Sequence, residues 1–554
     1  MLRLLLVGIL LYWLQGLGRL QAADESVVRV FIFAGQSNMV GSDSKIGDIS
    51  LYPPFAGLDQ PQPKVRFSYC LGREDKLESE GWEPLRPVAN VVGPELSFAR
   101  EVSRQISAPI AIIKIAAGGT HLGGDWNPDQ PTGFQLYPLA LRRIREALGQ
   151  LDSQGVRWRL EGFMWHQGEN DMFEPDYMAN YGKNLRNFIA SWRRDLAAPE
   201  LRFFIGELCT KTIWGMDLRP RMYAISLGQR EVAEADPLVE YVPTSHVGVE
   251  IGGGVGLHYH YGTLGQLEHG VCYARSWLQA TGQWKPASRR LVVWPYEKGS
   301  KIRLFVLAGH RNMEGERAFV QDLAKLPDGK SLLQADSKTA CRYWQGGGYT
   351  VSDGWEPAGP FGEYETFGPE LSFNAALQRA GVQNVAIAKF THSGSQIIDW
   401  TPAGSEAKSR NLYPEFLQFM KQSISELEAR GHEVELAGVF YHVGENDMSW
   451  GPFRQGAAER VTALVKAVRQ DLGQPQLPWF ISQQPPTDHE SVNRVDVAKM
   501  LADALAADDF SRHIRLENLP MQREQLVLDA AGVVWLGERL AEQYLAAVTP
   551  KSAK

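Results

Sequence analysis

Cysteine is scarce in this sequence, with only four cysteines among 554 residues. They stand at positions 70, 209, 272 and 341, so no two of them lie at the spacing that zinc ligands require. Four scattered cysteines are also too few for a disulfide framework, although one incidental bridge could form. The scarcity therefore excludes a small disulfide-stapled fold and a cysteine-rich metal site.

The sequence also lacks an excess of positive charge and, beyond its first residues, any long apolar run. Lysine and arginine together number 57 against 64 acidic residues, and the formal net charge of −7 argues against nucleic acid as a partner. The exception is the N-terminus, where a basic Arg3, an apolar stretch 4–14 and small residues at 22–23 indicate a signal peptide over residues 1–23. An uncleaved anchor is the alternative. We expect a secreted or periplasmic protein with no later transmembrane segment.

One large internal repeat organises the chain, which is long enough for two domains. An apolar run at 30–34 ends in the turn GQSNMVG at 35–41, and the same pattern returns 274 positions later as GHRNMEG at 309–315. Four more motifs recur at offsets of 273 to 276: GWEP at 81 and 354, GPELSF at 93 and 368, YP at 137 and 413, and GENDM at 168 and 444. We therefore predict two domains, 24–286 and 287–554, with the boundary in a polar stretch near Pro286.

Apolar strands alternate with segments of helical periodicity inside each repeat. In the first repeat the predicted strands are 110–115, 160–164 and 201–206, the predicted helices are 96–106, 139–151, 177–195 and 270–280, and 51–64 reads as a loop. Strands that alternate with helices predict an α/β fold with a parallel sheet covered on both faces.

Ser37 stands where the first buried strand ends, which is the edge at which open parallel sheets bind their ligands. Met39 occupies the place of the second glycine of a Gly-x-Ser-x-Gly elbow, so the α/β-hydrolase interpretation is weakened. If Ser37 is a nucleophile, it therefore belongs to a class of serine hydrolase other than the α/β-hydrolases.

Five motifs in the first repeat together resemble the SGNH hydrolases: GQSNM at 35–39, GPE at 93–95, GGT at 118–120, WHQGE at 165–169 and GLH at 256–258. More closely they resemble the sialate O-acetylesterase-like domain, which includes the acetylxylan esterases of carbohydrate esterase family six. The resemblance covers about 28–278 and, in degenerate form, 302–545. It implies two tandem three-layer α/β/α domains of the flavodoxin-like SGNH type.

The resemblance also implies the catalytic roles. Ser37 would be the nucleophile and His258 the base, because a serine hydroxyl reacts poorly until a base takes its proton. The oxyanion of the reaction needs fixed donors, which would be the backbone N–H groups of Ser37 and Gly93 and the side-chain amide of Gln167, with Asn170 as the second choice. No metal and no organic cofactor is needed.

The acid that should orient His258 is where the sequence departs from the family, since Val255 stands where an aspartate usually lies. Glu169 of the His-Gln-Gly-Glu motif is our first candidate. We expect its carboxylate to lie within hydrogen-bond reach of an imidazole nitrogen of His258. Glu250 is the alternative, and a dyad without an acid is a third arrangement.

The second repeat has lost more of the set. Arg311 replaces the nucleophile, Val443 replaces the amide of Gln167, and Val527 stands where the histidine would align. We therefore predict a non-catalytic domain in which Arg311 closes the old cleft, the alternative being that it binds an anionic sugar. Glu445 is its expected partner, because a buried guanidinium needs a carboxylate.

The function that follows is a secreted serine esterase that removes acetyl groups from an acetylated carbohydrate, of the acetylxylan or sialate type, through an acetyl-enzyme on Ser37. A lipase-like or general esterase is a related alternative. A non-catalytic carbohydrate-binding protein built from two degenerate esterase domains is the alternative from another class. The sequence alone leaves the sugar and the oligomeric state open.

Overall fold

The computed structural model describes residues 26–74, 76–208, 212–213, 216–247, 259–285, 294–406, 410–449, 451–484, 495–516 and 527–548. The predicted signal peptide, His258, Glu250 and Val255 lie outside these ranges, and the side chain of Glu445 is not described either. Contacts divide the chain into two compact units, the first comprising Met1–Thr212, Asp217–Thr244 and His258–Pro286 and the second the remaining residues.

The first unit is built on an eight-stranded sheet in the order β10-β7-β6-β1-β5-β2-β3, with β4 paired to β2. The strands are β1 Val28–Gly35, β2 Gln62–Leu71, β3 Leu77–Glu78, β4 Glu83–Leu85, β5 Ile110–Ala116, β6 Trp158–His166, β7 Phe203–Gly206 and β10 Val239–Val242. All pairs are parallel except those that β3 and β4 make with β2. A separate small sheet joins β8 Thr212–Ile213 to β9 Met216–Asp217.

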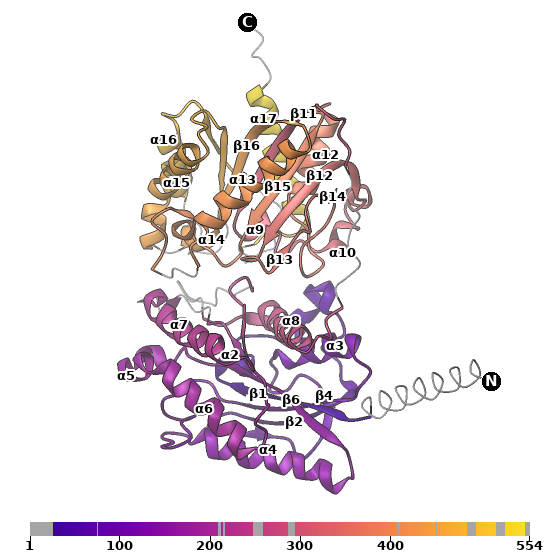
Figure 1. Cartoon of the computed structure of the whole chain (residues 1–554), viewed down its shortest axis with the longest axis vertical. Helices are drawn as coiled ribbons and strands as arrows, with labels where there is room; N and C mark the ends of the chain where they lie inside the picture. Colours follow the sequence, from indigo (N-terminus) through magenta and orange to yellow (C-terminus); the bar gives the residue numbers. More distant parts are fainter. Residues whose placement is uncertain are drawn as a thin grey trace, which may run out of the picture. The chain divides into compact units, whose positions relative to one another are not determined.

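Helices cover both faces of this sheet (Figure 1). The rings of Phe98 in α3 and Trp277 in α8 pack edge-on against Phe31 of β1, so α3 and α8 share one face. The rings of Phe188 and Trp192 in α6 pack against Phe163 of β6, on the opposite face together with α4. The helices are α2 Ser37–Val40, α3 Glu95–Gln105, α4 Leu136–Ser153, α5 Pro175–Ala179, α6 Tyr181–Asp195, α7 Arg219–Ala235 and α8 Gly262–Ala280.

Strand β1 is central because every one of its residues is buried. Its apolar side chains face helices on both sides, as in a parallel strand with two covered faces. The one charged residue inside it, Arg29, is tolerated because its guanidinium donates to the Glu161 carboxylate of β6 at 2.7 Å.

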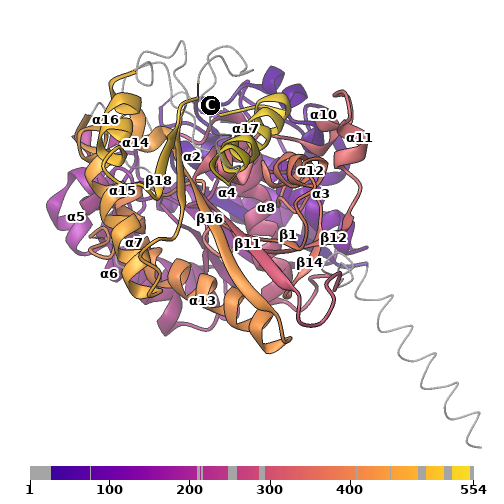
Figure 2. The same ribbon diagram turned by 90° about the horizontal axis from the view of Figure 1, so that it is seen from above.

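The second unit repeats the first strand for strand, in the order β13-β12-β15-β11-β16-β17-β18 with β14 paired to β12. Figure 2 shows its sheet passing between α13 and α15 on one face and α12 and α17 on the other. The strands are β11 Lys301–Gly309, β12 Asp336–Gln345, β13 Thr350–Val351, β14 Glu356–Ala358, β15 Val385–Thr391, β16 Glu433–Val443, β17 Trp479–Gln483 and β18 Ser511–Ile514. The helices are α9 Arg311–Glu314, α10 Val320–Leu323, α11 Gly329–Leu332, α12 Glu370–Arg379, α13 Tyr413–Ala429, α14 Glu445–Ser449, α15 Gly451–Asp471, α16 Val495–Leu505 and α17 Ala530–Val548.

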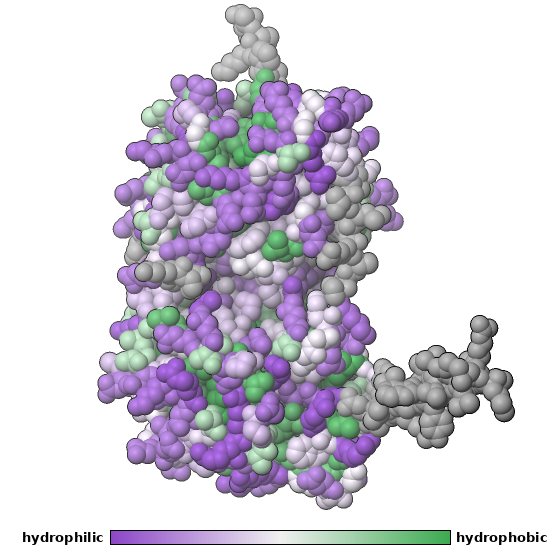
Figure 3. Space-filling model, viewed as in Figure 1, coloured by the Kyte–Doolittle hydropathy of each residue, from purple (hydrophilic) through white to green (hydrophobic). Residues whose placement is uncertain are grey.

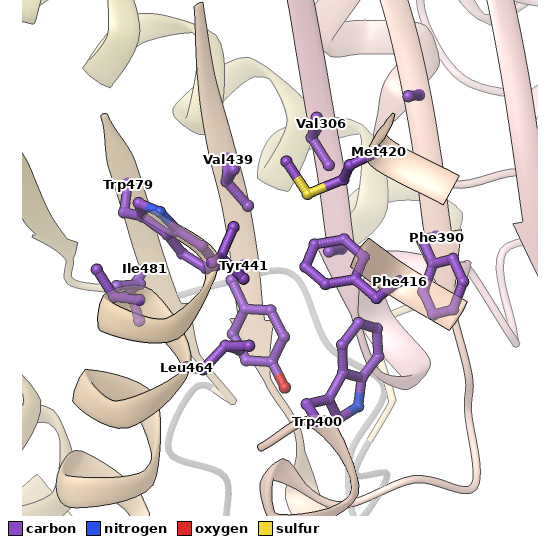
Figure 4. Packing of buried hydrophobic residues seen from close by; sticks show 14 of the residues in the cluster. Val306, Phe390, Trp400, Phe416, Met420, Val439, Tyr441, Leu464, Trp479 and Ile481 are labelled. Carbon is purple, nitrogen blue, oxygen red and sulfur yellow. The ribbon is translucent and has the colours of Figure 1, made fainter. Parts of the chain in front are cut away.

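The core of the second unit is densely aromatic on the α13 face. Phe416 and Met420 of α13 point toward Val306 of β11 and Tyr441 of β16, and Trp400 closes the group (Figure 4). Side chains of this size bury large apolar areas and exclude water from the sheet. The predicted fold of two tandem three-layer α/β/α domains is therefore confirmed.

Several details differ from the sequence-based expectation. Strand β2 begins inside the predicted loop 51–64, and α8 begins at Gly262, eight residues before the predicted helix. The predicted helix 177–195 is broken at Asn180 into α5 and α6. Helix α7 and strand β10 had not been predicted.

The surface offers no membrane-spanning element among the described residues, because no helix there is long and apolar enough to cross a bilayer. On the face drawn in Figure 3, hydrophilic residues predominate and apolar residues form small separate groups. The large apolar side chains that are exposed are scattered along the chain: Leu51, Leu77, Met216, Leu227, Val351, Phe510 and Val548.

Candidate active site

Three loops of the first unit leave the sheet at the same level, at the carboxyl ends of adjacent strands. Gly35 of β1 is in register with Ala116 of β5 on one side and with His166 of β6 on the other. After β1, the chain adds β2 and β5 on one side of β1 and then adds β6, β7 and β10 on the other side. The strand order therefore reverses at β1, as it does at the ligand sites of other open α/β sheets. The motifs that begin at Gln36, Gly118 and Gln167 therefore meet at one edge.

Ser37 is the first residue of the short helix α2 and is partly exposed. Gly35 precedes it with φ of 151°, and a Cβ there would lie 2.0 Å from the carbonyl oxygen of His166, so only glycine lets β1 turn so close to β6. The loop at Gly118 packs beside Ser37, since a Cβ on Gly118 would lie 3.5 Å from the serine Cβ. No hydrogen bond engages the Ser37 hydroxyl within the described ranges, so it is available to a ligand.

A buried amide network joins the three loops at this edge of the sheet. Gln167 donates through its Nε2 to Gln36 Oε1 at 3.1 Å, to the Thr120 carbonyl at 2.9 Å and to Asp171 Oδ2 at 2.5 Å. Asp171 also accepts from the backbone N–H groups of Leu122 and Gly123. Burial raises the pKa of Asp171 in spite of these donors. The network fixes the three loops to one another.

Gln167 and Asn170 therefore differ in what they can offer an oxyanion. Gln167 is fully buried and its two amide hydrogens already face three acceptors. Asn170 is partly exposed, and its Oδ1 accepts from Gln36 Nε2 at 3.1 Å. Its own Nδ2 donates to no acceptor in the part of the chain that the structure describes. Asn170 is thus the side-chain amide with a free donor.

Glu169, the residue we expected to orient His258, contacts two other side chains. Its Oε1 accepts from Asn38 Nδ2 at 2.6 Å and lies 3.5 Å from His166 Nε2. Burial raises the pKa of Glu169, but the His166 ring and the Asn38 amide lower it more, so that it stays below its usual value. Because His258 lies outside the described residues, its predicted contact with Glu169 stays a prediction.

The turn that follows His258 is tied to the residue after the serine. Asn38 donates through Nδ2 to the Tyr259 carbonyl at 2.9 Å, and its Oδ1 accepts from the Tyr261 N–H at 3.2 Å. Between these two residues, His260 places its Nδ1 2.6 Å from Asp43 Oδ2. Sequence reasoning missed this pair, because the two residues are 217 positions apart.

Gly93 is held by a buried ion pair behind it. Lys114 Nζ lies 2.7 Å from Glu95 Oε2, both side chains are buried, and a Cβ on Gly93 would lie 2.2 Å from each of these atoms. Burial lowers the pKa of Lys114 although Glu95 raises it in turn. The Gly93 N–H donates to no acceptor within the described residues, whereas its counterpart Gly368 donates to Glu370 Oε1 at 3.0 Å. The first unit alone keeps this donor available.

Two buried histidine rings lie deeper in the first unit. The centroids of His166 and His269 are 4.7 Å apart, and a Cβ on Gly206 would lie 2.5 Å from His166 Nδ1. Burial holds the pKa of His269 well below its usual value, and His166 lowers it further. In the second unit the matching His442 instead places Nδ1 2.9 Å from the Ser482 hydroxyl.

At the equivalent position of the second unit, Arg311 forms a buried ion pair with Glu316. Arg311 begins helix α9 as Ser37 begins α2, and its Nη1 lies 2.8 Å from both carboxylate oxygens of Glu316. Glu316, with 6% exposure, is thus a partner of Arg311. The expected contact with Glu445, whose side chain lies outside the described residues, stays a prediction. Val443 is buried in the apolar core.

The tryptophans that could have stacked on a sugar are core residues where they are described. Trp126 and Trp165 are both 0% exposed and pack edge to face with ring centroids 5.2 Å apart. Three cysteines, Cys70, Cys272 and Cys341, are buried and take part in no disulfide bond, whereas Cys209 lies outside the described residues. Within the described ranges no group of three or more histidine, cysteine or acidic side chains is arranged to hold a metal ion.

Comparison with solved structures gives matches to single domains of low identity. A protein of Arabidopsis thaliana is 20% identical and covers 45% of this chain and 98% of its own, with a TM-score of 0.35. NanS is 17% identical and covers 47% of this chain and 99% of its own, with a TM-score of 0.35. A carbohydrate acetylesterase from Xanthomonas citri is 19% identical and covers 45% of this chain and 57% of its own, with a TM-score of 0.33. A comparison with curated proteins gave no match.

Comparison with protein families gives a match over both repeats. Residues 27–279 and 301–546 each match the family described as "Carbohydrate esterase, sialic acid-specific acetylesterase". The two matched regions together span most of the chain. The chain therefore belongs to this carbohydrate esterase family and carries the family's domain twice.

Proposed function

We propose that the protein is a serine esterase that removes O-acetyl groups from a carbohydrate, of the acetylxylan or sialate type, through an acetyl-enzyme on Ser37. The observation that carries the proposal is the position of Ser37, at the carboxyl end of β1 where the strand order reverses, with no hydrogen bond to its hydroxyl from any described residue. The family match over residues 27–279 supports the same activity.

The chemistry follows from the groups around the serine. Ser37 Oγ attacks the acetyl carbonyl carbon while His258 or His260 takes its proton. The negative charge that forms on the carbonyl oxygen is stabilised by donors already in place: the N–H groups of Ser37 and Gly93 and the Asn170 amide. The sugar hydroxyl leaves with the proton from the imidazole. Water then gives its proton to the same imidazole and attacks the acetyl carbon, so that acetate is released and Ser37 Oγ regains the proton.

The second unit contributes no catalytic group in this proposal. Arg311 stands at the nucleophile position and cannot act as one, because it stays protonated at any ordinary pH. We further propose that residues 1–23 direct the protein to export, so that it meets its polymeric substrate outside the cytoplasm.

Acetate release from acetylated xylan, acetylated sialic acid and 4-nitrophenyl acetate tests the proposal. Wild-type protein should release acetate, and Ser37→Ala should release none while its unfolding midpoint stays the same, because the hydroxyl has no partner to lose. A fluorophosphonate should add its mass at Ser37 and not in the second unit. A wild-type protein that neither hydrolyses these esters nor reacts with the fluorophosphonate would instead be a non-catalytic carbohydrate-binding protein.

A further inference from the structure

We propose that the residues which activate Ser37 are His260, as the base, and Asp43, as the acid that orients it. The inference rests on the proposed esterase function, and it assigns the place left empty by Val255 to a residue from the other end of the domain. Neither Asp43 nor His260 belongs to the motifs that drew attention to the site.

The contact between the two side chains is the one that a catalytic histidine needs. His260 Nδ1 lies 2.6 Å from Asp43 Oδ2, a distance typical of a strong charge-assisted hydrogen bond. A carboxylate on Nδ1 fixes the proton there and leaves Nε2 as the acceptor for a serine proton. Nε2 of His260 meets no partner among the described residues, and 14% of the side chain is exposed.

Hydrogen bonds tie both members of this pair to the segment that carries Ser37. Asn38, the next residue, bonds the backbone on both sides of His260 through its side-chain amide. The Ser37 carbonyl accepts from the N–H groups of Gly41 and Ser42, so that Asp43 directly follows the turn that Ser37 begins.

The backbone of Lys45 adds two hydrogen bonds to Thr263, at the start of α8. Its N–H donates to Thr263 Oγ1 at 2.8 Å, and the same hydroxyl donates to its carbonyl at 3.2 Å. The segment 43–45 is therefore tied to the start of α8, which the turn 259–261 leads into. The Asp43–His260 bond and these backbone hydrogen bonds thus tie the segment 37–45 to the turn 259–261.

The second unit provides an internal comparison. The Leu528 N–H donates to Asn312 Oδ1 at 2.8 Å, just as the Tyr261 N–H donates to Asn38, so Val527 is the counterpart of His260. Asp43 corresponds to Arg317, six residues after Arg311 as Asp43 is six after Ser37. The unit that has lost the nucleophile has thus lost the base and the acid with it.

The framework residues behave in the opposite way. Asn38, Glu95, Lys114, Glu169 and Asp171 are all retained in the second repeat, as Asn312, Glu370, Lys389, Glu445 and Asp447. Retention of Glu169 in a unit without a nucleophile indicates a use that does not depend on the serine, and its contacts with Asn38 and His166 are such a use. This comparison separates Glu169, which is retained, from Asp43, which is not, and assigns the acid to Asp43.

The test compares histidine and aspartate variants of the full-length protein with 4-nitrophenyl acetate and a fluorophosphonate. His260→Asn should lower kcat by at least about 1,000-fold and slow labelling of Ser37 to the same degree, whereas His258→Asn should lose far less. Asp43→Asn should lower kcat by about 10- to 100-fold with KM within twofold, because the carboxylate is exposed to solvent, and Asp43→Glu should recover part of the loss. Asp59→Asn, a matched exposed carboxylate, should change neither constant.

Each outcome decides between the alternatives. Loss of turnover in His258→Asn with turnover retained in His260→Asn would overturn the assignment of the base. Unchanged kcat in Asp43→Asn, or a rise in KM alone, would overturn the assignment of the acid. A wild-type protein that neither turns over substrate nor takes the label would remove the proposed function itself, which is a different result from either.

Discussion

The side-chain amide of Asn38 donates to Glu169 Oε1 at 2.6 Å and to the carbonyl of Tyr259 at 2.9 Å, so that one residue joins the third loop of the site to the turn carrying the histidines. Glu169 is buried and its pKa lies below the usual value, because the His166 ring and the Asn38 amide outweigh the effect of burial. Its carboxylate thus acts on the position of a neighbouring loop.

Glu169→Gln should therefore destabilise the first unit more than it slows chemistry. We expect a loss of about 1–3 kcal/mol in the free energy of unfolding, since a buried charge-assisted bond is replaced by a neutral one. Denaturant titration and kcat measured on the same sample give the two numbers. A kcat lowered by about 1,000-fold with unchanged stability would instead restore Glu169 as the triad acid.

Substitutions of the two amides in the third loop, Asn170 and Gln167, should likewise differ in whether they affect kcat or stability. Asn170→Ala should lower kcat by about 100-fold or more with only a small loss of stability, because it removes a free donor to the oxyanion and a single hydrogen bond from Gln36. Gln167→Ala should lower the unfolding midpoint first, since it leaves Asp171 and the Thr120 carbonyl short of a buried donor. If Gln167→Ala is as stable as wild type yet inactive, the oxyanion donor is Gln167.

The buried pair Lys114–Glu95 should matter for folding and only indirectly for catalysis. Lys114→Met leaves a carboxylate buried without its partner and should cost about 3–5 kcal/mol of stability. The double variant Lys114→Met with Glu95→Leu should recover most of that cost. Equal stability of single and double variants in denaturant titration would contradict this account.

His269 should make the first unit sensitive to acid. Its pKa is far below 6.5 in the folded protein because it is buried beside His166, so only the unfolded chain takes up its proton near that pH. Stability is therefore lost as pH falls below about 6.5, at up to about 1.4 kcal/mol per pH unit. Leu536 occupies the equivalent place in the second repeat, which makes His269→Leu the matched variant.

Thermal unfolding of both proteins between pH 7 and pH 5 checks this dependence. The wild-type midpoint should fall relative to that of His269→Leu as the pH is lowered. Parallel curves for the two proteins would mean that His269 does not carry the effect.

Arg311 should be needed for the stability of the second unit, because it neutralises the buried carboxylate of Glu316. Arg311→Ser should cost about 3–5 kcal/mol and should yield no esterase activity, whereas Arg311→Met with Glu316→Leu should be close to neutral. Reaction of Arg311→Ser with a fluorophosphonate at the new serine would show that a working site survives there.

The sequence was enough to predict the fold and the edge where the site lies, because both depend on patterns local to the chain. Apolar strands that end in glycine turns predict β1, and the repeat of those turns predicts the second unit. Strand β2 was missed although its alternation of Lys64, Arg66 and Ser68 with apolar residues is the pattern of a half-buried strand.

The contacts inside the site could not be predicted in the same way. The pairing of His260 with Asp43, of Asn38 with Glu169 and of Arg311 with Glu316 depends on how loops lie once the sheet has formed. Only the last pair is close in sequence, and there the motif suggested Glu445. Motifs identify which residues gather at an edge, whereas hydrogen-bond partners are decided by packing.

The close contact between α3 and α8 affects where the residues of the site lie, although most of the contact is outside the site. Gly270 of α8 lies so close to α3 that a Cβ would be 2.0 Å from the Pro94 carbonyl oxygen, and Gly537 meets Pro369 in the same way at 2.2 Å. Gly270 is about 12 Å along the helix from Gly262, where the turn of His260 enters α8. Because the helix is stiff, a displacement at this crossing is passed on to its first residues. A methyl group added at Gly270 would clash with the Pro94 carbonyl, next to the Gly93 donor, and would displace both that donor and the turn of His260 at the start of α8.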